Sequence, residues 1–212
     1  MQNFKYLPRK IAAEHKKEII ELLHLVQDEI RKYFTFSFYP VGSSSRNMIT
    51  LEPDGNIGFD FDYNIEPNVS DNEYKTFHIY NIIFEALRRH MGKFGYSKIE
   101  ASTSVITIKA VDRNNSRIEH SCDFAIVRKC VDGRQMYIEN DKFEGEILWK
   151  FRDNDYYIED KLLWIEKNGL KQLLRELYLV YKNRNNDKNK KSRTIFAEAV
   201  NDLFNKYYRH SS

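Results

Sequence analysis

The stretch Gly58-Phe59-Asp60-Phe61-Asp62-Tyr63-Asn64-Ile65 decides the fold, because it combines a strand-like apolar pattern with two acidic residues. Side chains alternate between the two faces of a strand, so Asp60 and Asp62 share one face and the aromatic residues beside them share the other. Two carboxylates one pleat apart repel each other, and a divalent cation between them is the usual compensation. The stretch therefore predicts a metal-binding strand whose other face packs into a core.

A turn rich in small polar residues precedes this strand. The run Val41-Gly42-Ser43-Ser44-Ser45 follows an alternating, strand-like segment over residues 34–39. Such a turn at a strand end offers backbone N–H groups and hydroxyls to a phosphate. Arg46 comes next, and it either meets a phosphate or forms a surface ion pair. A metal site and a phosphate site together indicate nucleotide chemistry.

A third acid lies in the later apolar run from Ile118 to Val127. Alternation places Asp123 on one face of this strand and His120 on the other, and the apolar residues after Asp123 predict a central strand. If this strand pairs beside the first, Asp123 joins the other two acids on one face. The alternative is an edge acid that pairs with a neighbouring arginine or lysine. Three acids on one face suit a two-metal site for phosphoryl chemistry.

In this order and setting, the features resemble the DNA polymerase β-like nucleotidyltransferase superfamily over roughly residues 34 to 130. The resemblance rests on Gly42-Ser43 at a strand end, Asp60 and Asp62 on the next long strand, and Asp123 on a later central strand. The gap between Ser43 and Asp60 is longer than in the compact family pattern. A turn at Pro53-Asp54-Gly55 accounts for the extra length.

The resemblance implies a substrate, two ions and a role for each residue. A nucleoside triphosphate such as ATP would be held by Gly42, Ser43 and Ser44, and two Mg²⁺ or Mn²⁺ ions would be bound by the three acids. Asp60 and Asp62 would ligate both ions. Asp123 would complete the site of the ion that activates an acceptor hydroxyl, so all three acids would be catalytic. The acceptor stays open between a nucleotide, an RNA end, a protein and a small molecule.

Hydrophobic periodicity predicts an α+β fold with a sheet-containing core over residues 1–150 and a helical part over residues 151–212. The resemblance implies that this core is nucleotidyltransferase-like. The core would hold a mixed β-sheet with flanking helices, one over residues 9–33 and one opened by the capping box Ser70-Asp71-Asn72-Glu73. The second helix would carry an apolar stripe from Phe77 to Met91. After Asp141 we expect helices, near residues 160–166, 170–181 and 195–208.

Composition narrows the class of protein. The 212 residues include 34 basic and 31 acidic side chains, a net charge of only +3, and 42% are hydrophobic. These values predict a globular core and exclude a protein that is basic throughout, although a local patch can still bind RNA. The two cysteines, Cys122 and Cys130, do not form a metal-binding motif, and no apolar stretch approaches a membrane span. We expect a cytoplasmic protein without membrane contact.

Several further residues have two interpretations. The loop from Lys182 to Arg193 is a solvated connector or a nucleic-acid contact. Tyr156 and Tyr157 pack in a core or stack on a base. His120 faces away from Asp123, which is more typical of a core histidine than of a ligand. The candidates for a triphosphate contact are Lys109, Lys161, Lys167 and Lys171.

The sequence thus predicts a metal-dependent nucleotidyltransferase that moves a nucleotidyl group to a hydroxyl and releases pyrophosphate. The alternative is a catalytically inactive nucleotide- or RNA-binding module of the same fold. Binding by such a module would depend strongly on salt and would survive loss of Asp60. A third class is an interaction protein whose C-terminal helices pack on a partner. Stabilisation by Mg²⁺ with nucleotide would argue against that class.

Overall fold

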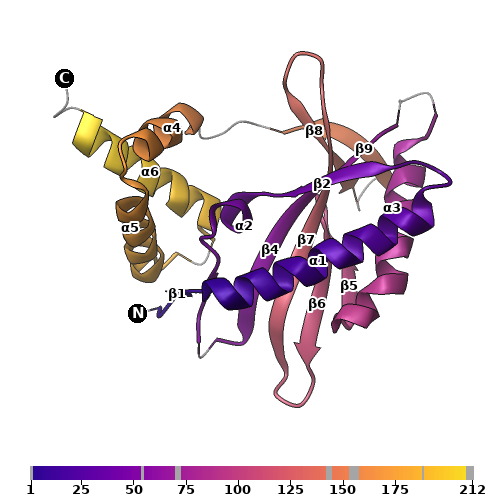
Figure 1. Cartoon of the computed structure of the whole chain (residues 1–212), viewed down its shortest axis with the longest axis horizontal. Helices are drawn as coiled ribbons and strands as arrows, with labels where there is room; N and C mark the ends of the chain where they lie inside the picture. The colour runs from indigo at the N-terminus through magenta and orange to yellow at the C-terminus, as the bar shows by residue number, and fades with distance from the viewer. Residues whose placement is uncertain are drawn as a thin grey trace. The chain divides into compact units, whose positions relative to one another are not determined.

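The computed structural model describes residues 2–53, 55–69, 73–141, 145–152, 158–187 and 189–208. The chain divides into two compact units, Tyr6–Arg152 and a second unit made of Met1–Lys5 with Asp153–Ser212. The first unit contains the sheet and the second contains the last three helices (Figure 1). The mixed α+β composition agrees with the predicted fold class.

A mixed sheet forms the centre of the first unit. Its main path runs β2 (Phe36–Pro40), β4 (Ile57–Pro67), β7 (Arg117–Lys129), β6 (Ile106–Asp112) and β5 (Lys98–Ala101). Strands β4 and β7 are parallel, and the other neighbours on this path are antiparallel. The parallel pair is possible because α3, β5 and β6 separate the two strands in sequence and return the chain to the same end of the sheet.

Two further strands extend the sheet, and the second of them corrects the prediction that the chain becomes helical after Asp141. Strand β8 (Gln135–Asp141) pairs with the last part of β7, and β9 (Glu146–Phe151) pairs with β8. In β9, Ile147, Trp149 and Phe151 alternate with residues that are polar except for Leu148. The helical interpretation overlooked this alternation. Pairing with β8 decides the conformation of this short segment, because strand preference depends strongly on the neighbouring strand.

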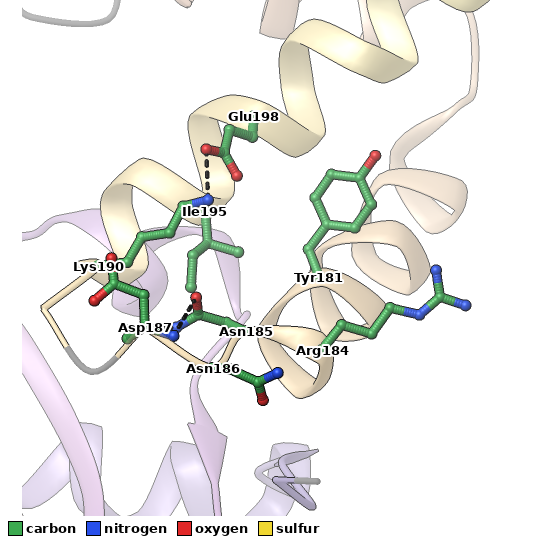
Figure 2. Close-up of a pocket in the computed structure, with 8 residues that line it drawn as sticks. All are labelled: Tyr181, Arg184, Asn185, Asn186, Asp187, Lys190, Ile195 and Glu198. Atoms are coloured by element: carbon green, nitrogen blue, oxygen red, sulfur yellow. Dashed lines mark hydrogen bonds and ion pairs between the residues drawn. The ribbon is translucent and has the colours of Figure 1, made fainter.

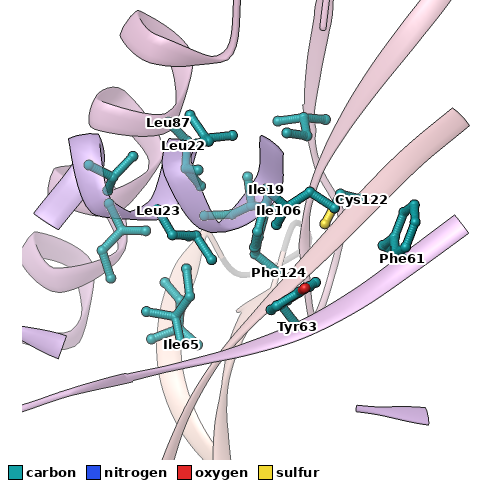
Figure 3. Packing of buried hydrophobic residues seen from close by; sticks show 14 of the residues in the cluster. Ile19, Leu22, Leu23, Phe61, Tyr63, Ile65, Leu87, Ile106, Cys122 and Phe124 are labelled. Atoms are coloured by element: carbon teal, nitrogen blue, oxygen red, sulfur yellow. The ribbon is translucent and has the colours of Figure 1, made fainter. Parts of the chain in front are cut away.

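The helices of this unit cover one face of the sheet (Figure 1). Helix α1 (Arg9–Ile30) lies close to the predicted range, and it packs against α3 (Thr76–His90), which the 3₁₀ turn η1 (Met91–Phe94) follows. The core between helices and sheet is shown in Figure 3. It includes side chains from both helices and from the two parallel strands, among them Ile19, Leu23, Leu87, Phe61, Tyr63, Ile65, Cys122 and Phe124.

Helix α3 differs from the prediction at its start and on its buried face. It begins at Thr76, after Lys75 in an extended conformation, so the helix does not open at the capping box. Residues 70–72 of that box lie outside the described residues. Tyr80 and Leu87 of the predicted stripe are buried, together with Ile79 and Ile83, whereas Phe77 is 54% exposed. The buried face therefore agrees with the predicted stripe in part and departs from it at Phe77.

Short elements complete the first unit. Helix α2 (Gly42–Arg46) follows β2, and strand β3 (Thr50–Leu51) has two residues. Strand β1 (Lys5–Tyr6) also has two residues, of which Tyr6 belongs to this unit. The predicted turn at residues 53–55 includes Asp54, which lies outside the described residues. Among the described helices of the chain, none combines the length and the apolar character needed to cross a bilayer.

The second unit consists of three helices close to the predicted ranges, α4 (Glu159–Lys167), α5 (Lys171–Arg184) and α6 (Ser192–Tyr208). Aromatic rings join them: Tyr178 lies 5.6 Å from Phe196, and Trp164 lies 5.3 Å from Phe204, between ring centroids. The amide of Asn183 on α5 bonds the backbone of Phe4 in both directions, at 2.6 and 3.1 Å. These two hydrogen bonds tie the first residues of the chain to this unit.

Candidate active site

The three predicted acids come together on one face of the sheet. The parallel register of β4 and β7 places Asp62 beside Asp123 and Asp60 beside Ser121. One carboxylate oxygen of each acid lies within 4.8 Å of the others. The predicted pairing of the two strands is therefore observed, and Asp123 meets the other acids rather than an arginine or lysine of its own strand.

The opposite face of β4 belongs to the core. Phe61, Tyr63 and Ile65 are at most 2% exposed, whereas Asp60 remains accessible to solvent and Asp62 is half-buried. The side-chain alternation that the sequence indicated thus divides the strand into a packed face and a carboxylate face. This arrangement anchors the acids on a rigid element, because shifting the strand by one residue would move its aromatic side chains out of the core.

Each of the three carboxyls has a raised pKa, and desolvation is the largest cause in all three. Desolvation by the surrounding protein and the charge of Asp123 raise the pKa of Asp60 to about 7, although a hydrogen bond from Ser121 opposes this. Desolvation and Asp123 likewise raise the pKa of Asp62 to about 6, against the opposing charge of Arg46. Desolvation also raises the pKa of Asp123, while a hydrogen bond from Thr107 lowers it. Without a cation, the protein thus disfavours three simultaneous negative charges here.

These properties fit a divalent metal. Carboxylate oxygens are the ligands that Mg²⁺ and Mn²⁺ prefer, and three of them converge from two neighbouring strands. A bound cation would remove the repulsion that raises the pKa of the carboxyls. Asp60, Asp62 and Asp123 are therefore the residues that could hold the ions.

The Gly-Ser turn lies directly against this cluster. The Val41 N–H donates to the carbonyl of Asp62 at 2.9 Å, which fixes the start of α2 to the middle of β4. Gly42 has φ +57°, and a Cβ atom at this position would lie 3.3 Å from Asp62 Oδ2. Glycine therefore allows both the left-handed backbone and the close approach of the turn to the carboxylate.

The three serines of the turn have different environments. Ser44 is fully buried, and its Oγ accepts a hydrogen bond from the Asp62 N–H at 2.9 Å. Ser45 Oγ donates to the Gly42 carbonyl at 3.0 Å, whereas Ser43 is half-exposed. Ser44 thus holds the turn and β4 together, which the sequence did not indicate. Its predicted contact with phosphate, like that of Ser43, stays a prediction.

Helix α1 also supports the turn. Lys16 Nζ donates to the Ser44 carbonyl and to Asn47 Oδ1, both at 2.7 Å, and burial lowers the pKa of this lysine. Asn47 ends α2 in the left-handed conformation, with φ 54°. Hydrogen bonds to both β4 and α1 therefore hold the turn in place. No sequence pattern distinguishes Lys16, because it lies on the polar side of an ordinary amphipathic helix.

Two hydroxyls beside the acids were also missed by sequence reasoning. Thr107 Oγ1 donates to Asp123 Oδ1 at 2.5 Å, and Ser121 Oγ donates to Asp60 Oδ1 at 2.7 Å. The antiparallel register of β6 and β7 places Thr107 opposite Asp123. Ser121 shares a face with Asp123 by simple alternation, which could have identified it. Thr107 could not be identified before the register of β6 was known.

The other residues with open interpretations have these positions. Lys109 forms an ion pair with Glu100 at 2.5 Å, Lys161 donates to Asn201, and Lys171 pairs with Glu166. His120 is buried in an aromatic cluster, stacked on Phe59, and burial lowers its pKa to about 4, which agrees with a core histidine. Tyr156 and Tyr157 lie outside the described residues.

A pocket of about 410 Å³ lies within the second unit, at the predicted basic loop (Figure 2). Its polar groups are largely paired with one another: Lys190 bonds Glu198 at 2.7 Å, and Asn185 and Asp187 bond each other. Acidic and basic side chains balance around it. The residues that line it are Tyr181, Arg184, Asn185, Asn186, Asp187, Lys190, Ile195 and Glu198. Its neutral, self-paired lining offers no clear match to an anionic ligand.

Comparison of the sequence with protein-family models and with curated proteins finds no match. Comparison with solved structures does. The chain superposes on Vibrio cholerae DncV bound to 3′-deoxy ATP with a TM-score of 0.58 and 16% identity, over 89% of this chain and 51% of DncV. It also superposes on the Bradyrhizobium diazoefficiens CD-NTase CdnG in complex with GTP, with a TM-score of 0.58 and 12% identity, over 92% of this chain and 66% of CdnG.

A further structure of DncV, described as a cyclic AMP-GMP synthase with the linear intermediate 5′ pppA(3′,5′)pG, gives a TM-score of 0.55 and 14% identity. It covers 93% of this chain and 58% of that protein. The chain thus spans half to two thirds of the length of these proteins. The match shows that the chain has the fold of these solved proteins, in agreement with the predicted mixed α+β fold.

Proposed function

We propose that the chain is a metal-dependent nucleotidyltransferase, which moves a nucleotidyl group from a nucleoside triphosphate to an acceptor hydroxyl and releases pyrophosphate. One observation carries the proposal. In a nucleotidyltransferase fold, three acids of like charge converge within 4.8 Å, and Gly42 at the Gly-Ser turn lies directly against one of them. A fold alone does not define an activity, whereas a cation site next to a phosphate-type turn defines a chemistry.

The solved neighbours support the choice of substrate. DncV structures contain 3′-deoxy ATP, GTP or a linear pppApG intermediate, and CdnG contains GTP. We infer that this chain also takes a nucleoside triphosphate. The acceptor provides a hydroxyl group, and experiment must decide between a nucleotide, an RNA end, a protein and a small molecule.

The residues of the site have separate tasks in this proposal. When bound, two Mg²⁺ or Mn²⁺ ions would stabilise charge on the reacting phosphate and lower the pKa of the acceptor hydroxyl. Asp60, Asp62 and Asp123 would hold them. Gly42 leaves space for phosphate oxygens to approach the backbone, and the half-exposed Ser43 can donate its hydroxyl. The buried Ser44 keeps the turn in place.

The test is transfer of label from each of the four α-³²P nucleoside triphosphates, with Mg²⁺ or Mn²⁺, to nucleotide, RNA, protein and small-molecule acceptors. We expect labelled product from the wild type, and a loss of at least about 1,000-fold in Asp60→Asn/Asp62→Asn, because metal stabilisation of the reacting phosphate provides several kcal/mol. Glu119→Gln is the matched control, since it neutralises an exposed acid on β7, two residues before Ser121.

Three results would count against the proposal. In the first, the wild type and the double variant bind nucleotide equally, binding is lost at high salt, and neither protein transfers label. This result would favour an inactive binding module over an enzyme. Absence of any cation-dependent nucleotide binding would remove both the enzyme and its proposed site. Equal loss of transfer in Glu119→Gln would show that the effect is not specific to the three acids.

A further inference from the structure

Two hydroxyl groups contact the carboxylates of the site, and each contacts a different acid. Thr107 Oγ1 lies 2.5 Å from Asp123 Oδ1, and Ser121 Oγ lies 2.7 Å from Asp60 Oδ1. The two hydroxyls come from different strands, β6 and β7, and strand register places each one beside its acid. The contacts are thus built into the sheet, not made by mobile loops.

Each contact restricts the carboxylate that it reaches. A hydroxyl that donates to Oδ1 restricts the rotation of the carboxyl group, and a backbone hydrogen bond from Phe61 acts on the Asp60 carboxyl as well. Without the donor, repulsion among three acids within 4.8 Å would favour turning their oxygens away from one another. Threonine is suited to the role, because branching at Cβ restricts its χ1 angle and so holds the hydroxyl in place.

We propose that Thr107 and Ser121 are positioning residues, which orient Asp123 and Asp60 so that their outer oxygens meet at one cation. The inference rests on the proposed function in assuming that the acids bind a divalent metal. It goes beyond that function, because it assigns the geometry of the site to two neutral side chains. Hydrogen-bond partners of metal ligands commonly contribute in this way.

Calorimetric titration of the purified full chain with Mn²⁺, without nucleotide, tests the assignment. We expect Thr107→Val and Ser121→Ala each to weaken Mn²⁺ binding by about 10- to 100-fold, the range usual for partners of metal ligands. Thr107→Ser keeps the hydroxyl and should restore most of the affinity. Ser37→Ala is the control, because Ser37 is an exposed serine of β2 outside the site.

A purely structural role predicts a different pattern. Loss of a structural contact lowers the melting temperature in EDTA and leaves the Mn²⁺ affinity of the folded protein unchanged. Affinities of both variants within twofold of the wild type would therefore overturn the inference while leaving the proposed function intact. A wild type that binds no Mn²⁺ would overturn both. If Thr107→Val does not fold, Thr107→Ala and Ser121→Ala provide the same comparison.

Discussion

Two charged clusters lie side by side on one face of the sheet, and they differ in how their charge is balanced. Cross-strand register forms the row Glu100, Thr107, Asp123 and Asp62 across strands β5, β6, β7 and β4. At one end, Glu100 bonds Lys98 and Lys109, both at 2.5 Å. At the other end, three carboxylates converge within 4.8 Å, and the charges of Arg46 and Lys109 act on Asp62 and Asp123.

The pKa values of the two clusters move in opposite directions. Hydrogen bonds from Lys109 and Lys98 lower the pKa of Glu100 to about 2. Desolvation and mutual repulsion raise the pKa of Asp60 to about 7 and that of Asp62 to about 6. In the first cluster the charges are balanced by ion pairs, whereas in the second the charges of Arg46 and Lys109 only partly offset the effects that raise the pKa of the carboxyls. A cluster of carboxyls with raised pKa on a rigid scaffold is a candidate functional site.

The largest expected difference is the response to a divalent cation. We expect Mn²⁺ at 100 times its dissociation constant to stabilise the first unit by about 2.7 kcal/mol. Asp60→Asn/Asp62→Asn should lose this stabilisation, and Glu100→Gln should retain it, because Glu100 already has its cations. Differential scanning fluorimetry with and without Mn²⁺ measures both. Equal loss in the two variants would show that the clusters are not functionally distinct.

The next effect concerns Gly42 and compares it with Gly133, which also has positive φ but has nothing within 4 Å of an added Cβ. Replacing either glycine by alanine should cost about 1–2 kcal/mol of stability, because the left-handed conformation is unfavourable for alanine. Only Gly42→Ala should also weaken Mn²⁺ binding, since its Cβ would press on Asp62. Chemical denaturation and calorimetry separate the two effects. Unchanged Mn²⁺ affinity in Gly42→Ala would contradict the contact.

A smaller effect is expected in the pH dependence of stability without metal. A carboxyl with a raised pKa in the folded state keeps its proton longer than in the unfolded chain. The contribution of Asp60 and Asp62 to stability should therefore fall as pH rises from about 4 to about 7, and level off above that. Denaturation in EDTA at several pH values checks this, with Asp60→Asn/Asp62→Asn as the reference that should lack the contribution of these two groups.

The smallest effect is expected for Glu100. Its pKa is lowered in the folded state, so its contribution is present above about pH 4.5 and is lost as pH falls towards 2. Because Glu100 and Lys98 are well exposed, Glu100→Gln should cost less than about 1 kcal/mol at neutral pH. A urea denaturation curve measures the cost. A much larger loss would mean that this ion-pair cluster supports the neighbouring acids.

The sequence predicted the parts of the molecule that depend on local pattern. Alternation along β4 and β7 identified the carboxylate face, and helical spacing identified α1 and the three C-terminal helices. It did not predict β9, because six residues with alternating character become a strand only beside β8. Nor did it predict Thr107, whose role depends on the register between two strands. Ser44 was recognised as part of the turn, but its burial could not be read from its neighbours in sequence.

The parallel pairing of β4 with β7 has a consequence for how the site forms during folding. The hydrogen bond between Ser121 and Asp60 joins residues 61 positions apart. Bringing the ends of so long a segment together lowers the entropy of the chain before the contacts between them can form. Sheets with such distant pairings therefore assemble slowly. During synthesis, β7 must leave the ribosome before Asp123 can come together with the other two acids. Cation binding is thus expected to appear late, as a reporter that the central sheet has closed.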